Sequence, residues 1–178
     1  MVKVKCISCK RDFEYNTSDL IMACEYCRKG TTLFVKKRLP NATLPKYEHE
    51  GDSGFDLSVC FEKDEMEILK VGEIKLFDTG LSFEIPRGYE IQIRPRSGMA
   101  AKKGVTVINS PGTIDEKYVG PIKIALINLG KEDVEIKQGM RVAQGVLCNV
   151  PKIKNFVEVE EINKNTSRGE GGFGSTGE

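Results

Sequence analysis

Four cysteines near the N-terminus form two pairs whose spacing is typical of a metal site. Each pair is a Cys-x-x-Cys motif, Cys6 with Cys9 and Cys24 with Cys27, and residues 10–23 separate the two motifs. Four thiolates can surround one ion in the tetrahedral geometry of structural zinc, although this separation is slightly shorter than the usual roughly 15–20 residues. A redox pair or an iron–sulfur site is the alternative, and no βα pattern supports the redox reading. The pattern predicts a structural Zn²⁺ in residues 1–30.

Three polar residues in the rest of the chain could do acid–base or ligand chemistry. Asp115 follows the Pro111-Gly112 turn at the expected start of a strand, where most carboxylates are simply solvated. Asp56 closes the stretch Gly51-Asp-Ser-Gly-Phe-Asp56 and has an equally ordinary interpretation as a turn residue. Gln144 is more unusual, because an amide inside the apolar run 141–147 needs hydrogen-bond partners and a bound ligand is one candidate.

A short helix is expected where cationic side chains gather. Residues 97–104 read Ser-Gly-Met-Ala-Ala-Lys-Lys-Gly, with a capping serine, good helix formers, lysines in the last turn and a terminal glycine. Arg94 and Arg96 come directly before it. The N-terminus of this helix would therefore aim backbone N–H groups and two guanidinium groups at an anion.

The C-terminal residues 165–178 are rich in glycine and cannot form a stable core element. On composition alone they read as a disordered tail. A basic residue, hydroxyl groups and a single phenylalanine also suit a segment that wraps a phosphate chain and covers a base.

The middle of the chain predicts an all-β domain. Short runs alternate between apolar and polar residues, which is typical of half-buried strands. These runs are 33–35, 74–76, 81–85, 89–93, 122–126, 134–136 and 157–159. Turn signals such as Asp78-Thr-Gly80 and Pro86-Arg-Gly88 separate them. The expected organisation is a zinc module over 1–30, a β-barrel or sandwich over 31–164 and a tail over 165–178.

Composition excludes several classes of function. A formal net charge of +1 argues against a nonspecific polyanion binder. No apolar run approaches the roughly 20 residues that cross a bilayer, and the N-terminus has no secretory h-region. The expected localisation is cytoplasmic, with no membrane partner. In such a reducing compartment Cys60 and Cys148 are expected to pack as small buried hydrophobic residues.

Five segments, in order, resemble the motifs of the trimeric dUTPase family. Together they cover nearly everything from Thr31 to Glu178. They are Asp52-Ser-Gly-Phe-Asp-Leu57, Pro95-Arg-Ser-Gly98, Asn109-Ser-Pro-Gly-Thr-Ile-Asp-Glu-Lys-Tyr-Val-Gly120, Arg141-Val-Ala-Gln144 and Arg168-Gly-Glu-Gly-Gly-Phe-Gly-Ser-Thr-Gly177. The resemblance implies a distorted jelly-roll β-barrel and a homotrimer with shared active sites. In that family the C-terminal arm of one subunit closes over a site that the other two build, so the tail is expected to act as a mobile lid.

The resemblance also implies the chemistry, which is hydrolysis of dUTP to dUMP and pyrophosphate. This reaction limits uracil incorporation into DNA and supplies dUMP for dTMP synthesis. Asp115 resembles the general base for a water that attacks the α-phosphorus, and Asp56 resembles the acid that holds Mg²⁺ through water. The residues that match phosphate contacts are Arg96, Ser97, Gly98, Gln144 and, in the arm, Arg168, Gly174, Ser175 and Thr176. Phe173 of the arm matches the aromatic residue that stacks over uracil.

Base and sugar selection are implied for the third motif. Uracil would be read mainly by backbone groups of this hairpin, at Gly112, Thr113 and Ile114, with help from Asn109. Tyr118 would pack against the deoxyribose and exclude a 2′-hydroxyl. Lys123 lies where family members approach the nucleotide, or is simply an exposed strand lysine.

Some residues depart from the family pattern. Val119, Met140 and Gly145 stand where relatives carry arginine, an acid and a bulky aliphatic residue, so detailed subunit contacts are open. The related dCTP deaminases share the fold and an arginine-serine segment, but they need a glutamate base and lack the fifth motif. A catalytically idle relative would lack role-bearing residues, and none is missing here.

The resemblance offers no role for the cysteine segment. Its charged residues sum to +2, from six basic and four acidic side chains. Contact with a protein is the first expectation for this segment and a tether to DNA or RNA the second.

Overall fold

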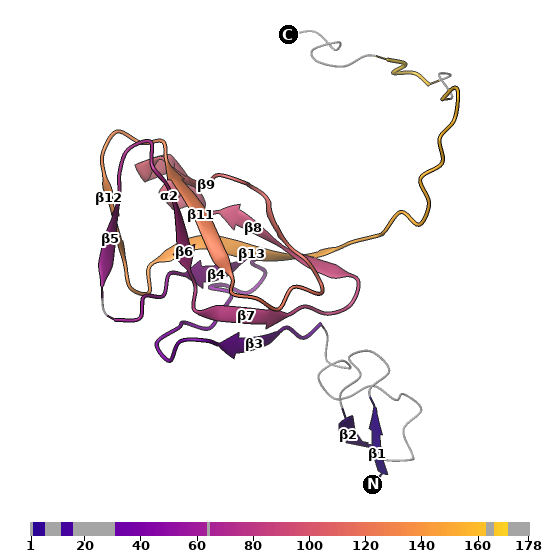
Figure 1. Ribbon diagram of the computed structural model, residues 1–178, viewed down its shortest axis with the longest axis horizontal. Coiled ribbons are helices and arrows are strands. Elements are labelled where there is room, and N and C mark those ends of the chain that lie inside the picture. The colour runs from indigo at the N-terminus through magenta and orange to yellow at the C-terminus, as the bar shows by residue number, and fades with distance from the viewer. Residues whose placement is uncertain (1, 6–11, 16–30, 64, 163–165, 171–178) are drawn as a thin grey trace.

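The fold was analysed in a computed structural model, which describes residues 2–5, 12–15, 31–63, 65–162 and 166–170. Strands dominate these residues, so the prediction of a mostly β domain is confirmed (Figure 1). The helix in the described ranges, α2 (Ser97–Lys103), has seven residues. Within those ranges, no helix has the length and apolar character needed to cross a bilayer.

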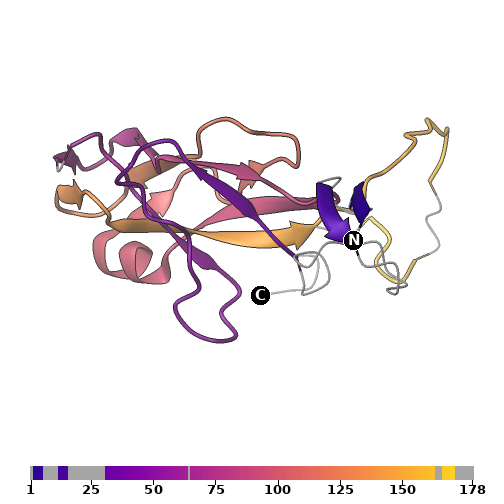
Figure 2. The same ribbon diagram turned by 90° about the horizontal axis from the view of Figure 1, so that it is seen from below.

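Short antiparallel sheets surround one core (Figures 1 and 2). The four-stranded sheet has the order β10 (Gly112–Ile114), β8 (Tyr89–Pro95), β13 (Arg141–Asn149), β4 (Phe55–Ser58). The three-stranded sheet has the order β6 (Ile74–Asp78), β11 (Lys123–Asn128), β9 (Val105–Val107). Two pairs complete the body, β12 (Val134–Lys137) with β5 (Met66–Leu69) and β3 (Phe34–Lys37) with β7 (Leu81–Glu84).

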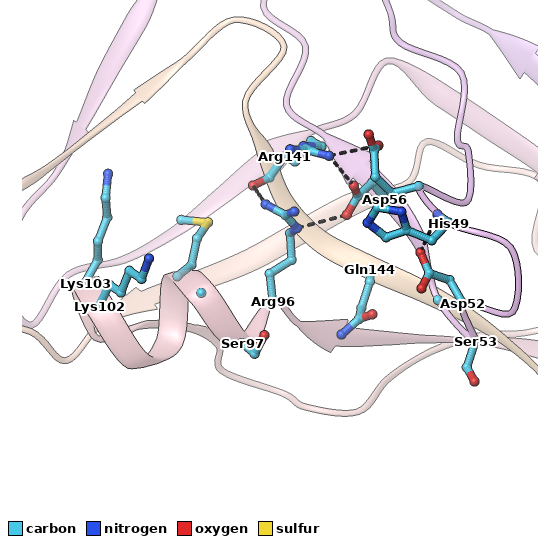
Figure 3. A pocket seen from close by; sticks show the side chains of 14 residues that line it. His49, Asp52, Ser53, Asp56, Arg96, Ser97, Lys102, Lys103, Arg141 and Gln144 are labelled. Atoms are coloured by element: carbon cyan, nitrogen blue, oxygen red, sulfur yellow. Dashed lines mark hydrogen bonds and ion pairs between the residues drawn. The ribbon is translucent and has the colours of Figure 1, made fainter.

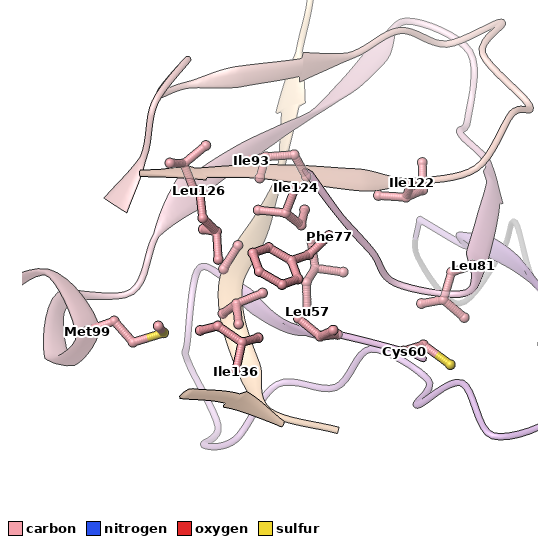
Figure 4. Packing of buried hydrophobic residues seen from close by; sticks show 14 of the residues in the cluster. Leu57, Cys60, Phe77, Leu81, Ile93, Met99, Ile122, Ile124, Leu126 and Ile136 are labelled. Atoms are coloured by element: carbon pink, nitrogen blue, oxygen red, sulfur yellow. The ribbon is translucent and has the colours of Figure 1, made fainter. Parts of the chain in front are cut away.

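The core forms where the alternating strands turn their apolar faces inward (Figure 4). Phe77 of β6 lies opposite Ile124 of β11, and both side chains are almost fully buried. Cys60 is also in this core, as expected. The expectation for Cys148 was wrong, because it is only partly buried, at an end of β13 where its thiol lies 3.9 Å from the Arg94 guanidinium.

The register of β13 determines which polar residues meet. Gln144 of β13 pairs with Asp56 of β4 on one side and with Arg94 of β8 on the other. The register shifts between Arg141 and Ala143, and such irregularities re-aim side chains locally. Segments far apart in sequence thereby present charged groups at one end of the sheet.

The helix forms where expected and ends at Gly104, whose left-handed backbone (φ 68°) closes the last turn. The expected serine cap was wrong. The N-cap residue is Arg96, which has an extended backbone and makes no side-chain capping bond, so Ser97 is the first helical residue. The Arg96 side chain is engaged elsewhere, in the contacts described below.

The expected strand over 157–159 was also wrong. Residues 150–162 have no strand assignment and run away from the sheets (Figure 1). Their large apolar side chains, Phe156 and Val157 among them, are 59–87% exposed. The alternating pattern is present, but no strand among the described residues pairs with this segment.

Near the N-terminus, β1 (Val2–Lys5) and β2 (Asp12–Tyr15) pair as an antiparallel hairpin, with Lys5 opposite Asp12. Cys6, Cys9, Cys24 and Cys27 lie outside the described residues. The zinc prediction therefore stays a prediction.

Candidate active site

A cavity of about 620 Å³ opens at the end of the four-stranded sheet (Figure 3). Three parts of the chain line it, namely the loop 48–54 with Asp56, the start and last turn of α2, and β13 through Arg141 and Gln144. The first, second and fourth motif segments thus converge, and Asp56, Arg96, Ser97, Gly98 and Gln144 share one cavity.

Asp56 is held between two guanidinium groups. Its Oδ1 accepts from Nε of Arg96 at 2.9 Å, and its Oδ2 accepts from Arg141 at 2.9 Å. Arg96 also donates to the backbone carbonyl of Arg141 at 3.3 Å. With an exposed fraction of 15% for the Asp56 side chain, these paired charges sit partly out of water and hold the carboxylate in one orientation.

Gln144 lies beside this cluster, and its hydrogen bonding is now explained in part. Its Nε2 donates to the Pro95 carbonyl at 2.9 Å, which ties β13 to the residue before Arg96. Its Oε1 faces Gly54 so closely that a Cβ at position 54 would lie 2.3 Å away. The glycine of the first motif therefore makes space for the glutamine of the fourth.

The start of α2 adds neutral donors to this positive wall. Ser97 and Gly98 line the cavity at the beginning of the helix, and Lys102 and Lys103 line it at the end. Within the described part of the chain, the side chains of Ser97 and Lys102 have no hydrogen bond or ion pair, and the charge of Lys103 interacts with Glu135. Hydroxyl, N–H and ammonium donors at one cavity suit a polyanionic ligand such as a phosphate chain.

The side chains that line the cavity suit a metal ion that binds together with a phosphate ligand. They do not make up the ligands of a permanently bound metal. Among the described residues, no three His, Cys, Asp or Glu side chains converge. Mg²⁺ keeps several waters and commonly takes one or two carboxylates plus substrate phosphates. A single carboxylate whose two oxygens already accept from guanidinium groups can hold such an ion through water, as Asp56 was predicted to do.

The third motif does not contribute to this cavity. Residues 109–118, for which the name hairpin is kept below, are β10 with a turn on either side; β10 pairs with β8, and none of these residues lines the cavity. Thr113 and Asp115 are exposed, and Gly112 is buried against Asn109 and Ile93. Tyr118 is 42% exposed and donates to the Pro121 carbonyl at 3.0 Å. Within one chain, therefore, the predicted residues of the third motif do not line this cavity. These residues are Asn109, Thr113, Ile114, Asp115 and Tyr118.

The remaining predicted residues are also outside the cavity. Lys123 is exposed at the start of β11, opposite Asp78, which agrees with a strand lysine and does not test a nucleotide contact. Arg168 is exposed in the tail. Phe173, Gly174, Ser175 and Thr176 lie outside the described residues.

Several cavity residues were not predicted to have a role. Arg141 was quoted only as part of a motif, and Glu48, His49 and Asp52 were not considered as site residues. The sequence could have indicated a site role for Arg141, because it opens the fourth motif, three residues before Gln144. Glu48 gave no signal, because its contact with Arg141 joins residues 93 positions apart.

A family model described as dUTPase matches residues 40–177, which span the cavity, the hairpin and the tail. The chain belongs to the dUTPase family. The match excludes the residues before 40, and with them the four cysteines.

Members of the dUTPase family resemble this chain over most of its length. The deoxyuridine 5′-triphosphate nucleotidohydrolase of Hydrogenobaculum sp. is 52% identical over 145 residues, which cover 82% of this chain and 97% of that protein. The Brucella melitensis enzyme of the same name is 51% identical over 136 residues, covering 75% and 84%. A structure of the Staphylococcus bacteriophage 80alpha dUTPase with dUpNHpp has a TM-score of 0.70 and 28% identity, covering 82% and 98%.

Proposed function

We propose that this chain hydrolyses dUTP to dUMP and pyrophosphate at a site that separate copies of it build together. Its place among the dUTP nucleotidohydrolases makes it a dUTPase enzyme. The observation that carries the shared site is the separation of the phosphate cavity from Asp115 within one chain. The reaction limits uracil incorporation into DNA and provides dUMP for dTMP synthesis.

The cavity side binds the triphosphate. Arg96, Ser97, the Gly98 backbone and Gln144 would donate to phosphate oxygens, with Lys102 and Lys103 adding positive charge nearby. These groups are fixed before the ligand arrives, because Asp56 and the Arg141 carbonyl orient Arg96 and the Pro95 carbonyl orients Gln144. Donors held in this way stabilise charge that grows on the phosphates in the transition state.

The metal-binding role falls on Asp56, which would hold Mg²⁺ through water beside the phosphates. Bound Mg²⁺ supplies charge neutralisation and a fixed shape for the triphosphate. The protein's part is to hold Asp56 in one orientation, which the contacts with Arg96 and Arg141 do.

Asp115 of another copy of the chain would act as the general base in the bond-breaking step. Its carboxylate would accept a proton from a water whose oxygen attacks the α-phosphorus. The bond between that phosphorus and the oxygen bridging to the β-phosphorus breaks, and pyrophosphate leaves. Asp115 is exposed at the end of β10, so it can be presented to a neighbouring subunit.

Selection of base and sugar would come from the same hairpin. The backbone of 112–114 and Asn109 would bind uracil, and the Tyr118 ring would exclude a 2′-hydroxyl. The hydrogen bond from the Tyr118 hydroxyl to the Pro121 carbonyl supports this role, because it holds the ring in place. Lys123 remains a second candidate contact at the edge of the nucleotide.

A homotrimer is supported by an unpartnered apolar sheet face. On the outside of the three-stranded sheet, the register aligns Leu76, Ala125 and Ile108 in one row. Ile74, Ile127 and Thr106 form the next row. The exposed fractions are 57% for Ile74, 59% for Leu76 and 44% for Ile108. A contiguous patch of this kind is unusual on a monomer and marks a contact surface.

The C-terminal arm, residues 165–178, would close the site of a neighbouring subunit. Residues 150–162 support this, because they leave the body in an extended form with apolar side chains exposed. Arg168, Gly174, Ser175 and Thr176 would contact the terminal phosphates, and Phe173 would cover uracil.

One assay tests the substrate. The protein is incubated with Mg²⁺ and dUTP, dCTP, dTTP or UTP in turn, and release of pyrophosphate and of ammonia is followed. Pyrophosphate from dUTP alone is the expected result. Ammonia from dCTP would assign the chain to the deaminases instead, and no turnover of any nucleotide would support an idle relative.

We also propose a structural Zn²⁺ on Cys6, Cys9, Cys24 and Cys27. The β1–β2 hairpin supports it, because Lys5 and Asp12, which flank the first Cys-x-x-Cys motif, are paired. A hairpin turn is a common position for two zinc thiolates. One zinc per chain by elemental analysis, lost in Cys6→Ser, is expected. Protein contact is the first role we assign to this module and nucleic-acid contact the second.

A further inference from the structure

A chain of ion pairs runs along one wall of the phosphate cavity. Lys46 contacts Glu48 at 3.1 Å, Glu48 contacts Arg141 at 3.0 Å, and Arg141 contacts Asp56 at 2.9 Å. Arg96 completes the chain at the other Asp56 oxygen. Basic and acidic groups alternate along it, and Glu48 is the acidic member without a place in the mechanism.

One nitrogen of Arg141 serves both carboxylates. Its Nη1 donates to Glu48 Oε2 at 3.0 Å and to Asp56 Oδ2 at 2.9 Å. An arginine at a phosphate cavity ordinarily offers its guanidinium group to phosphate oxygens in a bidentate manner. Here both hydrogens of one terminal nitrogen are taken by carboxylates, so a phosphate can reach Arg141 only through its other nitrogens, beside two negative charges.

Glu48 is fixed in this place by its loop. The Asp56 N–H donates to the Lys46 carbonyl at 3.0 Å, which holds residue 46 beside β4. The following turn closes on itself, since the His49 N–H donates to Asp52 Oδ2 at 2.8 Å and the Asp52 N–H to the His49 carbonyl at 3.3 Å. Lys46 lowers the pKa of Glu48, chiefly by its hydrogen bond, so the carboxylate is ionised at neutral pH.

We infer that Glu48 is a positioning residue that makes the cavity prefer metal-complexed triphosphate over free triphosphate. The inference rests on the proposed function. A free triphosphate has to approach two carboxylates whose negative charge offsets that of Arg141. In a metal complex part of the phosphate charge is neutralised, and the same carboxylates attract the hydrated cation. Asp56 alone would give a weaker preference, because Glu48 adds a second negative charge and a second bond to Arg141.

The test measures binding without turnover. The full-length protein, in its native assembly, is titrated calorimetrically with the α,β-imido analogue of dUTP, once with Mg²⁺ and once with EDTA. The variants are Glu48→Gln, which keeps the size of the side chain, and Glu48→Asp, which keeps its charge. The matched control is Glu50→Gln, because Glu50 is exposed on the same loop and does not line the cavity.

The quantity compared is the Kd without Mg²⁺ divided by the Kd with Mg²⁺. In Glu48→Gln this ratio falls about three- to fivefold, the effect expected of one partly exposed ion pair, and mainly because the metal-free analogue binds more tightly. Glu48→Asp keeps more of the ratio than Glu48→Gln, and Glu50→Gln keeps all of it.

Two results would overturn the inference. One is an unchanged ratio in Glu48→Gln while the wild-type protein shows a clear Mg²⁺ preference. The other is an equal fall in Glu50→Gln, which would assign the effect to the overall charge of the loop. Failure of the wild-type protein to bind the analogue even with Mg²⁺ contradicts the proposed function itself, so the two failures are distinguishable.

Discussion

The phosphate cavity and the hairpin 109–118 carry equally specific motifs but are held in opposite ways. In the cavity, Asp56 binds two arginines of its own chain and Gln144 binds the Pro95 carbonyl. In the hairpin, Asp115 is exposed, and within the described residues no ion pair or hydrogen bond reaches its side chain.

The hairpin is nevertheless not loose. The Tyr118 N–H donates to the Asp115 carbonyl at 3.0 Å, and Glu116 accepts from the Gly88 N–H at 2.9 Å. Backbone bonds thus fix the hairpin while its functional side chains are left outward. The difference supports the proposal that one chain assembles the binding half of the site and only displays the chemical half.

The strongest test of this division is complementation between two inactive variants. Asp115→Asn removes the base and should lower kcat about 10²–10⁴-fold. Arg96→Ala removes the phosphate donor and should be similarly defective. Mixed trimers, formed by co-refolding equal amounts, should recover about a quarter of the wild-type sites, each pairing an intact cavity with an intact hairpin from different chains. Pyrophosphate release measures the recovery.

The matched control is a mixture of Asp115→Asn with Asp115→Asn/Arg96→Ala, in which no chain contributes an intact base. It should stay inactive. Recovery confined to the first mixture supports a shared site, and no recovery in either would place the whole site within one chain.

A second variant separates the two halves physically. Leu76→Glu puts a charge on the exposed apolar face and should dissociate the assembly. Turnover should then fall in proportion to the fraction of monomer, as measured by light scattering on the same sample. The control is Ile153→Glu, because Ile153 is similarly exposed but lies in the segment 150–162 and not on this face. An active Leu76→Glu monomer would contradict the division.

A smaller effect is expected from crowding inside the cavity half. In Gly54→Ala the new methyl group meets Gln144 Oε1 and should turn the amide away from the phosphates. The expected loss is about 1 kcal/mol in kcat/KM for dUTP. The double variant Gly54→Ala/Gln144→Ala should lose little beyond Gln144→Ala alone, because both act on one contact. Additive losses would mean that Gly54 acts by another route.

The smallest effect concerns a residue outside both halves. Burial raises the pKa of the Cys60 thiol, so its contribution to stability is complete below the unfolded value of about 8.5 and is lost as pH rises through the higher folded value. Wild-type protein should therefore lose more unfolding free energy between pH 8 and 10 than Cys60→Ala, by less than about 1.4 kcal/mol per pH unit. Urea unfolding measures it, with the partly exposed Cys148→Ala as control.

The sequence determined much of this protein, because its signals are local. Alternation in β6 places Phe77 inside and Leu76 outside, and Gly104 ends α2 as its conformational freedom allows. Three of the five motifs contain residues that line one cavity, namely Asp56, Arg96, Ser97, Gly98 and Gln144. Local pattern failed where a partner was decisive: residues 157–159 alternate like a strand without pairing, and Ser97 follows the N-cap instead of forming it.

Only the tertiary structure decided which of these residues meet. The contact of Arg141 with Asp56 joins positions 85 residues apart, and that of Arg141 with Glu48 joins positions 93 apart. Both depend on the register of β13 against β4 and on the shift between Arg141 and Ala143. Gln144 lies against Gly54, just before β4, whereas Asp115 follows β10, which pairs with β8, and does not line the cavity. These contacts could not be predicted from the sequence, because the pairing and packing of strands, and not the spacing along the chain, set the distance between residues on different strands.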